Sequence, residues 1–226
     1  MRVDVAFTPA EAREAPVGVV VDVMRATSTI VQALASGYER VLCTVEIEEA
    51  LRLKAELPAA VTAGERGGRD LPEFDLGNSP AEFTEPRGDT LILSTTNGTR
   101  AIVAAAATCE TVLIGSLLNL RAVAAAVRER GEDALVLCSG WVGGFALDDA
   151  LCAGRIVDAV GAARTDAAIA ASLVSRSFPD AVAGISARTY GPDGLEDDIR
   201  WCARESVLDA VPRLAEMRGA AAEVTL

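Results

Sequence analysis

Polar and charged side chains gather where four predicted strands of this 226-residue chain end. In a sheet whose strands alternate with helices, ligands bind outside the carboxyl ends of the strands. We therefore treat the groups that follow these strands as one candidate site. The groups are Asp22, Arg25, Thr27 and Ser28; Glu65 and Arg66, with Asn78 further along; Thr95, Thr96, Asn97, Gly98, Thr99 and Arg100; and Gly143, Gly144, Asp148 and Asp149.

These residue types suit an anionic ligand that is bound together with a divalent metal. Glycine-rich turns that enter helices point backbone N–H groups at an anion, and the planar arginine fork grips phosphate or sulfonate oxygens. Carboxylates are hard oxygen ligands, and Mg²⁺ typically takes one or two of them together with waters and substrate phosphate. The sequence has no histidine, so Mg²⁺ or Mn²⁺ is favoured over zinc.

The absence of histidine also excludes whole classes of enzyme. Ser-His-Asp hydrolases, HExxH metalloproteases and His-ligated iron sites all need an imidazole. Acid–base chemistry must then come from carboxylates, a thiol, metal-bound water or Lys54, which is the only lysine. The sequence also contains neither a GxxxxGK[ST] phosphate-binding loop nor a GxGxxG turn after a strand.

Each of these groups also has a purely structural interpretation. Asp22 fits a helix cap or a turn, and residues 95–99 fit a turn followed by a cap. Asp148 and Asp149 could simply favour the positive end of a helix dipole. The three arginines could be solvated or paired with carboxylates. The functional interpretation depends on these groups meeting in one cavity.

The composition is that of a globular chain with an acidic surface. The sequence is 50% hydrophobic and 24% charged, with a formal net charge of −12. Nucleic-acid binders need a basic face and anionic membranes attract basic segments, so neither is an expected partner. The five cysteines form no CxxC pair, and the sequence shows no signal peptide and no apolar run of membrane length. These features predict reduced thiols in a cytoplasmic protein.

Strand-like and helix-like segments alternate along the chain. A β-branched run such as residues 17–23 is typical of a strand covered on both faces. The alternation predicts an α/β fold, with a mostly parallel or mixed sheet covered by helices in a single domain spanning residues 1–226. The chain from residue 165 onward is predicted to be mostly helical, which gives a helical C-terminal third. Strands are predicted at 3–7, 17–23, 40–45, 60–63, 90–94, 111–115 and 134–138, and helices at 27–36, 47–57, 99–107, 120–130 and 147–160.

Four strings of residues, in this order, resemble the 2-phosphosulfolactate phosphatase family. They are VVVDVMRATSTIVQAL (19–34), GERGGRDLPEFDLGNSPAEF (64–83), TTNGTRAI (95–102) and GFALDDALCAGRIV (144–157). The resemblance covers nearly the whole chain. It implies an α/β fold and a Mg²⁺-dependent phosphatase that hydrolyses 2-phosphosulfolactate to 3-sulfolactate and phosphate, a step on the route to coenzyme M. It also implies that acidic residues coordinate the metal and that arginines bind the acid groups of a small anionic substrate.

We carry these roles onto the matching positions as a hypothesis. The catalytic residues would be Asp22, Arg25, Glu65 and Asp148. The metal would be held by Asp22, Glu65 and Asp148 or Asp149. The attacking group is either a water or Asp22 itself, and the second route forms an aspartyl-phosphate.

The remaining positions would bind the substrate. Arg25 and the turn at 95–99 would hold the phosphoryl group, while Arg66 and Arg100 would hold the carboxylate and the sulfonate. Further substrate-binding assignments are Thr27, Ser28, Asn78, Thr95, Thr96, Asn97, Gly98, Thr99, Gly143 and Gly144.

Two other functions remain open on the sequence alone. One is a Mg²⁺-dependent phosphatase or lyase that acts on another small phosphorylated or sulfonated 2-hydroxy acid. The other is a non-catalytic anion-binding module, although a pure binder has no need of carboxylates beside an anion. A homodimer is the expected assembly, since two-fold dimers are the commonest soluble oligomers.

Overall fold

One mixed sheet of eleven strands runs through the molecule, with the strand order β5-β4-β6-β3-β11-β10-β7-β2-β8-β1-β9. This computed structural model describes the whole chain, Met1–Leu226. The strands are β1 (Arg2–Ala6), β2 (Ala15–Val21), β3 (Arg40–Thr44), β4 (Val61–Arg66), β5 (Arg69–Asp70), β6 (Thr90–Ser94), β7 (Cys109–Gly115), β8 (Ala134–Cys138), β9 (Ala163–Arg164), β10 (Arg213–Arg218) and β11 (Ala221–Thr225). The α-helices are α1 (Ala26–Ser36), α2 (Ile47–Glu56), α3 (Gly98–Thr108), α4 (Leu120–Arg130), α5 (Leu147–Val160), α6 (Asp166–Arg176), α7 (Ala181–Ser186) and α8 (Glu196–Cys202), and two 3₁₀ turns are η1 (Pro9–Glu11) and η2 (Pro80–Phe83).

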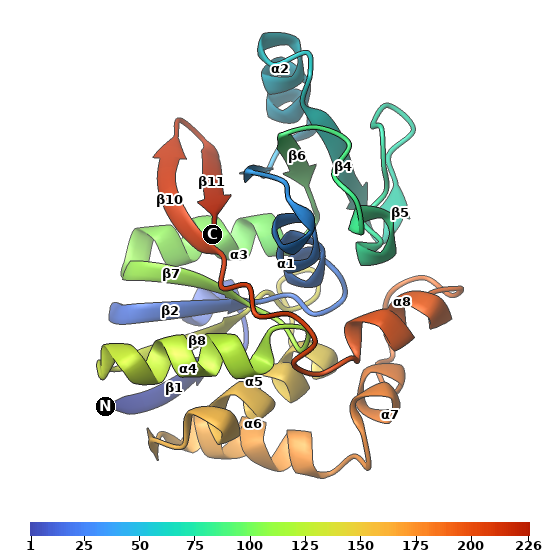
Figure 1. Cartoon of the computed structure of the whole chain (residues 1–226). Helices are drawn as coiled ribbons and strands as arrows, with labels where there is room; N and C mark the ends of the chain where they lie inside the picture. Colours follow the sequence, from blue (N-terminus) through green and yellow to red (C-terminus); the bar gives the residue numbers. More distant parts are fainter.

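Two parallel blocks of strands make up most of this sheet. Strands β1, β8, β2 and β7 pair in parallel, and so do β3, β6 and β4. The C-terminal hairpin joins the blocks, because β10 pairs antiparallel with β7 and β11 pairs antiparallel with β3. The blocks are steeply inclined to each other, so that β2 and β4 both point toward the middle of the molecule (Figure 1). Their carboxyl ends therefore meet although they belong to different blocks.

Strand β2 illustrates why a β-branched run forms a central strand. Val17, Val19 and Val21 belong to a core shared with α4, α5 and α6, whereas Val20 belongs to a core shared with α1 and α3. All four side chains are fully buried. Successive side chains of a strand point to opposite faces, so an uninterrupted apolar run fits a strand that helices cover on both sides. The predicted α/β fold with a mixed sheet is confirmed.

Helices α1 and α4 each end at a glycine. Gly37 after α1 has φ of 115° and Gly131 after α4 has φ of 69°, which places both in the left-handed region that favours glycine. Asn119 precedes α4, but its side chain makes no cap. Its amide group instead donates to the carbonyls of Ile114 at 3.1 Å and Ala210 at 2.9 Å, which ties the C-terminal segment to the end of β7.

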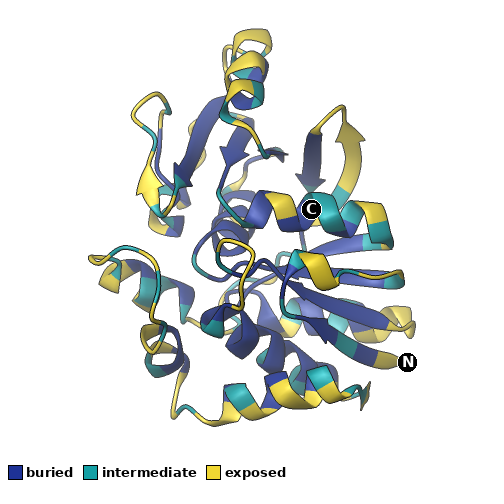
Figure 2. Ribbon diagram, turned by 180° about the vertical axis from the view of Figure 1, so that it is seen from behind, coloured by how far each residue is buried: buried dark blue, intermediate teal, exposed yellow.

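The prediction of a helical C-terminal third is wrong for its last segment. Helices α6, α7 and α8 follow one another up to Cys202, but the chain then ends in the β10–β11 hairpin. Strand β10 is mostly exposed and β11 mostly buried (Figure 2). The charged residues of β10 and the alanines of β11 carry no apolar alternation, which is the signal that would have predicted strands.

The five cysteines are all free thiols. Cys43, Cys138, Cys152 and Cys202 are buried, and Cys109 is half-buried. None of the helices combines the length and the apolar character that crossing a bilayer requires.

Candidate active site

A small polar cavity of about 30 Å³ lies beyond the carboxyl ends of β2, β4, β6 and β8. A space of this size holds roughly two water molecules. Six of the predicted site residues line it, and they come from five separate stretches of the sequence. These six are Asp22, Arg25, Glu65, Asn78, Asn97 and Asp148, and the other lining residues are Met24, Gly68, Trp141, Arg188, Tyr190, Gly191, Pro192 and Leu195.

Asp22 immediately follows β2 and is only 6% exposed. Its Oδ1 accepts a hydrogen bond from the backbone N–H of Ala26, 3.2 Å away, at the start of α1. Thr27 fixes the backbone of Asp22, because its Oγ1 accepts from the Asp22 N–H at 3.0 Å and donates to the Asp22 carbonyl at 2.9 Å. Burial, followed by repulsion from Glu65, raises the pKa of Asp22 to about 7. A carboxyl group with such a pKa exchanges protons readily at neutral pH.

Gly98, the first residue of α3, allows α3 to pack directly against the Asp22 carboxylate. A Cβ atom on Gly98 would lie 2.7 Å from Asp22 Oδ2 and 2.4 Å from the Cβ of Ala26. Both distances are too short for real contacts, so a residue without a Cβ is needed where α1 and α3 approach. The structure thus gives Gly98 a packing role beside Asp22.

Asp148 and Asp149 are adjacent in α5 but have different surroundings. Asp148 lines the cavity, and its Oδ1 accepts hydrogen bonds from the Tyr190 hydroxyl and from the Asp149 N–H. Asp149 does not line the cavity. Its carboxylate accepts from the Val23 N–H at 3.0 Å, the Ser139 hydroxyl at 2.9 Å and the Gly140 N–H at 3.0 Å, which holds the ends of β2 and β8 together. Burial raises the pKa of both carboxyl groups.

Glu65 lines the cavity and also links two of the turns that form it. Its carboxylate accepts from the Gly68 N–H at 2.6 Å, the Thr96 N–H at 2.7 Å and the Thr96 hydroxyl at 3.0 Å. Charge-assisted hydrogen bonds of this kind are among the stronger ones in proteins. Glu65 therefore fixes the turn after β4 against the turn after β6.

Of the three predicted arginines, only Arg25 lines the cavity. Its Nη1 forms an ion pair with Asp198 at 2.8 Å, and its Nη2 donates to the Gly68 carbonyl at 3.1 Å. Arg66 donates to the backbone carbonyls of residues 65 and 45 and to the hydroxyl of residue 94, each at 2.8 Å. Arg100 is exposed, and its nearest carboxylate belongs to residue 46 at 3.4 Å.

Several predicted hydroxyl groups stabilise the chain around the cavity and do not line it. Ser28 Oγ donates to the Val23 carbonyl at 2.8 Å. Thr99 Oγ1 donates to the Thr95 carbonyl at 3.0 Å, and the Thr99 N–H donates to Thr95 Oγ1 at 3.2 Å. These bonds satisfy backbone groups at the starts of α1 and α3.

The turn after β8 contains the predicted residues Gly143 and Gly144. Hydrogen bonds of 2.9 Å in both directions between the backbones of Trp141 and Gly144 close this turn. The Val142 N–H donates to Asn97 Oδ1 at 3.0 Å, which connects the turn to the one after β6. Neither glycine lines the cavity, but the turn positions Trp141, which does.

The sequence prediction missed the contribution of the loop between α7 and α8. Arg188, Tyr190, Gly191 and Pro192 all line the cavity. The Tyr190 ring stacks on Trp141, with centroids 5.4 Å apart and an interplanar angle of 24°. No strand end precedes this loop, so the strand-end rule could not find it. The GPDG string at 191–194 was the one available signal, because it marks a turn in a segment predicted to be helical.

The donor groups of the cavity fit Mg²⁺. Asn78 Oδ1 is buried and has no hydrogen-bond partner, and it lines the same cavity as Asp22 and Asp148. An unpaired amide oxygen beside buried carboxylates suits a hard cation. No three His, Cys, Asp or Glu side chains are arranged as a metal site, but Mg²⁺ usually needs only one or two carboxylates because it keeps several waters.

Comparisons with known proteins agree on one family. The family model described as 2-phosphosulpholactate phosphatase matches residues 5–217. A "Probable 2-phosphosulfolactate phosphatase" of Thermus thermophilus is 40% identical over 226 residues, covering 95% of this chain and 94% of the relative. One of Carboxydothermus hydrogenoformans is 36% identical, covering 94% and 92%. A "2-phosphosulfolactate phosphatase" of Methanothermobacter thermautotrophicus is 37% identical, covering 86% and 84%. The chain therefore belongs to the 2-phosphosulfolactate phosphatase family.

Proposed function

We propose that this chain is a Mg²⁺-dependent phosphatase that converts 2-phosphosulfolactate and water into 3-sulfolactate and phosphate. The observation that carries the proposal is the convergence of Asp22, Asp148 and Arg25 on one cavity in a chain of this family. The substrate is the one named for the relatives described above. Phosphoryl transfer needs mainly positioning and charge stabilisation, and the cavity supplies groups for both.

Local charge must overcome an unfavourable overall charge. The chain carries a formal net charge of −12, and the proposed substrate is itself an anion with three acid groups. Surface charges farther away than about 8–10 Å are largely screened at physiological ionic strength. The guanidinium groups of Arg25 and Arg188 and the N-termini of α1 and α3 lie at or beside the cavity, and both kinds of group favour a bound anion.

Asp148 and Asn78 would hold the Mg²⁺, with Asp22 and Glu65 adding negative charge on the same cavity. When bound, the metal would neutralise charge on the transferred phosphoryl group. Asp22 would accept the proton of the attacking water, since its buried carboxyl group lines the same cavity. In the competing route, Asp22 would attack phosphorus itself, break the ester P–O bond to release 3-sulfolactate and form an aspartyl-phosphate, which water would then hydrolyse to phosphate. Rapid-quench trapping separates the routes, because only the second gives a phosphoenzyme that is lost in Asp22→Asn.

Phosphate release from a panel of esters tests the proposed function. The panel contains 2-phosphosulfolactate, 2-phospholactate and ethyl phosphate, each assayed with metal-stripped protein before and after Mg²⁺ is added. The expected result is Mg²⁺-dependent release that is fastest with 2-phosphosulfolactate. Faster phosphate release from another ester would show that this ester is the better substrate. Binding of the esters without any phosphate release would show that the chain is an anion-binding module.

A further inference from the structure

Arg188 is the one guanidinium on the cavity that has no carboxylate partner. The other one, Arg25, is paired with Asp198 at 2.8 Å. Arg188 forms no ion pair, and its single hydrogen bond runs from Nε to the carbonyl of Tyr190 at 3.3 Å. Its Nη1 is buried without any hydrogen-bond partner. A buried donor without an acceptor calls for an explanation, and a bound ligand oxygen would supply one.

Resting on the function proposed above, we propose that Arg188 binds the second acid group of the substrate and thereby selects esters that carry one. The planar guanidinium fork matches the paired oxygens of a carboxylate or a sulfonate. Arg66 and Arg100 cannot fill this role in the structure, since neither lines the cavity. Arg188 is therefore the specificity-determining residue, and it enters from a loop instead of a strand end.

Arg188 reaches the cavity from the loop between α7 and α8. Asp22, Glu65 and Asn97 follow or end strands β2, β4 and β6, and so form the strand side of the cavity. The loop after α7 forms another wall. A phosphoryl group placed against the strand side would leave the rest of the substrate facing Arg188.

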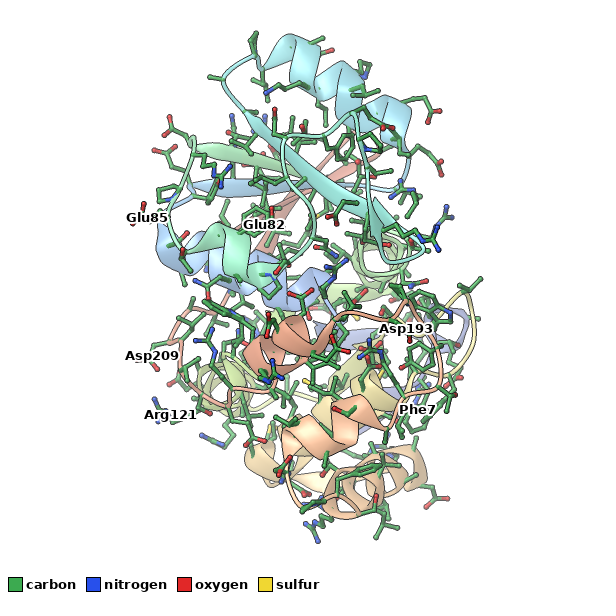
Figure 3. The ribbon with its side chains drawn as sticks, turned by 90° about the vertical axis from the view of Figure 1, so that its right-hand side faces the viewer. Phe7, Glu82, Glu85, Arg121, Asp193 and Asp209 are labelled. Carbon is green, nitrogen blue, oxygen red and sulfur yellow. The ribbon has the colours of Figure 1, made fainter.

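The loop between α7 and α8 covers the cavity and is the segment that we expect to move when this substrate enters. The cavity of about 30 Å³ holds roughly two waters, which is too little for a molecule with three acid groups. Tyr190 holds the loop closed, because its hydroxyl donates to Asp148 and its ring stacks on Trp141. Asp193, which belongs to this loop, is labelled in Figure 3. It lies between the upper half of the molecule, which carries Glu82, and the lower half. Loops that cover active sites in this way open on microsecond to millisecond timescales.

Kinetics with four esters test the role of Arg188. The esters are 2-phosphosulfolactate, 2-phospholactate without the sulfonate, the phosphate ester of isethionate without the carboxylate, and ethyl phosphate without either. In Arg188→Gln, the preference for 2-phosphosulfolactate over ethyl phosphate, measured as a ratio of kcat/KM, should fall at least tenfold. Arg188→Lys should lose less, since it keeps the charge without the fork. The single-acid ester whose kcat/KM falls more identifies the group that Arg188 binds.

An equal loss of kcat/KM on all four esters would overturn the proposal, because Arg188 would then serve the phosphoryl group or the fold. The matched control is Arg200→Gln. Arg200 is an exposed arginine of α8 that pairs with Asp197 and does not line the cavity. This variant should keep the parent's preference among the esters.

A binding measurement separates this proposal from the proposed function. In a Trp201→Phe background, Trp141 is the only tryptophan, so fluorescence reports on its stacking with Tyr190. Titration with 3-sulfolactate should change the fluorescence, and Arg188→Gln should raise Kd at least tenfold. If no ester releases phosphate but Arg188→Gln still raises the Kd for 3-sulfolactate, the proposed phosphatase function is wrong and the proposed role of Arg188 in binding is supported. If phosphate is released but the Kd for 3-sulfolactate is the same with Arg188 and with Arg188→Gln, then Arg188 does not bind the acid group.

Discussion

Arg25 and Asp198 form a buried ion pair, with Nη1 and Oδ2 2.8 Å apart and side chains that are 6% and 10% exposed. Ser79 Oγ donates to the other oxygen of Asp198. The pair thus connects Arg25, just before α1, with Asp198 of α8. The hydrogen bond from Ser79 connects α8 also with the segment that leads into η2. It holds Arg25 at the cavity and fixes the helix that follows the loop of Arg188.

Replacing Asp198 by alanine should lower the free energy of unfolding by about 3–5 kcal/mol, because Arg25 would remain as a buried charge without a partner. The matched control is Asp197→Ala. The side chain of Asp197 is 100% exposed, and such changes usually stay within about 0.5 kcal/mol. Urea unfolding followed by circular dichroism measures both. Equal stabilities of the two variants would contradict a structural role for the pair.

Asp22→Asn should stabilise the metal-stripped protein while it abolishes activity. A carboxyl group whose pKa is raised from 3.8 to about 7 in the fold costs stability as the pH rises from about 4 to 7, and the cost persists above pH 7. The asparagine removes this cost and keeps the Oδ1 acceptor for the Ala26 N–H. We expect a gain on the order of 1–4 kcal/mol at pH 8 in EDTA that fades as the pH falls toward 4. Thermal unfolding over this pH range measures the gain in stability. A gain that is larger at pH 4 than at pH 8 would contradict a raised pKa of Asp22 in the folded protein.

Gly98→Ala should reduce activity because the new Cβ would press on Asp22 Oδ2 and on Ala26. Overpacking of this kind typically costs about 1–3 kcal/mol of stability, and a displaced carboxylate costs turnover as well. The double variant with Ala26→Gly removes the contact at 2.4 Å but leaves the one at 2.7 Å to Asp22. It should recover part of the stability and little of the activity. Full recovery of kcat in the double variant would show that the contact with Asp22 is harmless.

The native protein should expose at most one cysteine to a thiol reagent. Burial raises the pKa of Cys43 and of Cys202 to about 12, and it raises the pKa of Cys138 and Cys152 as well. Buried thiols that stay protonated react slowly. Ellman's reagent should therefore titrate only the half-buried Cys109 in native protein and five thiols after denaturation. Rapid reaction of two or more thiols in the native protein would contradict the burial of these four cysteines.

The strand ends were predictable because β-branched runs and the turns that follow them are local features. Asp22, Glu65 and Asn97 were placed at the cavity by that rule alone. The direction of individual side chains was less predictable. Glu65 and Arg66 are neighbours in β4, and successive strand residues point to opposite faces, so only one of them lines the cavity.

The contributions of the loop and the hairpin depend on tertiary packing. Arg188 and Tyr190 reach the cavity only because α7 and α8 pack beside it, and no local pattern encodes that placement. The hairpin β10–β11 escaped prediction because its partners, β7 and β3, are about a hundred residues or more away in the sequence. Long-range pairing of this kind overrides local helix preference.

The cavity around Asp22 and Asp148 should release phosphate from a sulfonated substrate. The most direct measurement is phosphate release from 2-phosphosulfolactate by the parent chain, Asp148→Asn and the control Asp158→Asn, each with Mg²⁺ and with EDTA. Asp158 is an acidic residue of the same helix that pairs with Arg164 and Arg176 and does not line the cavity. We expect activity in the parent and in Asp158→Asn only with Mg²⁺, and a loss of about 10²–10⁴-fold in Asp148→Asn. Equal activity of the parent and Asp148→Asn, or full activity in EDTA, would contradict it.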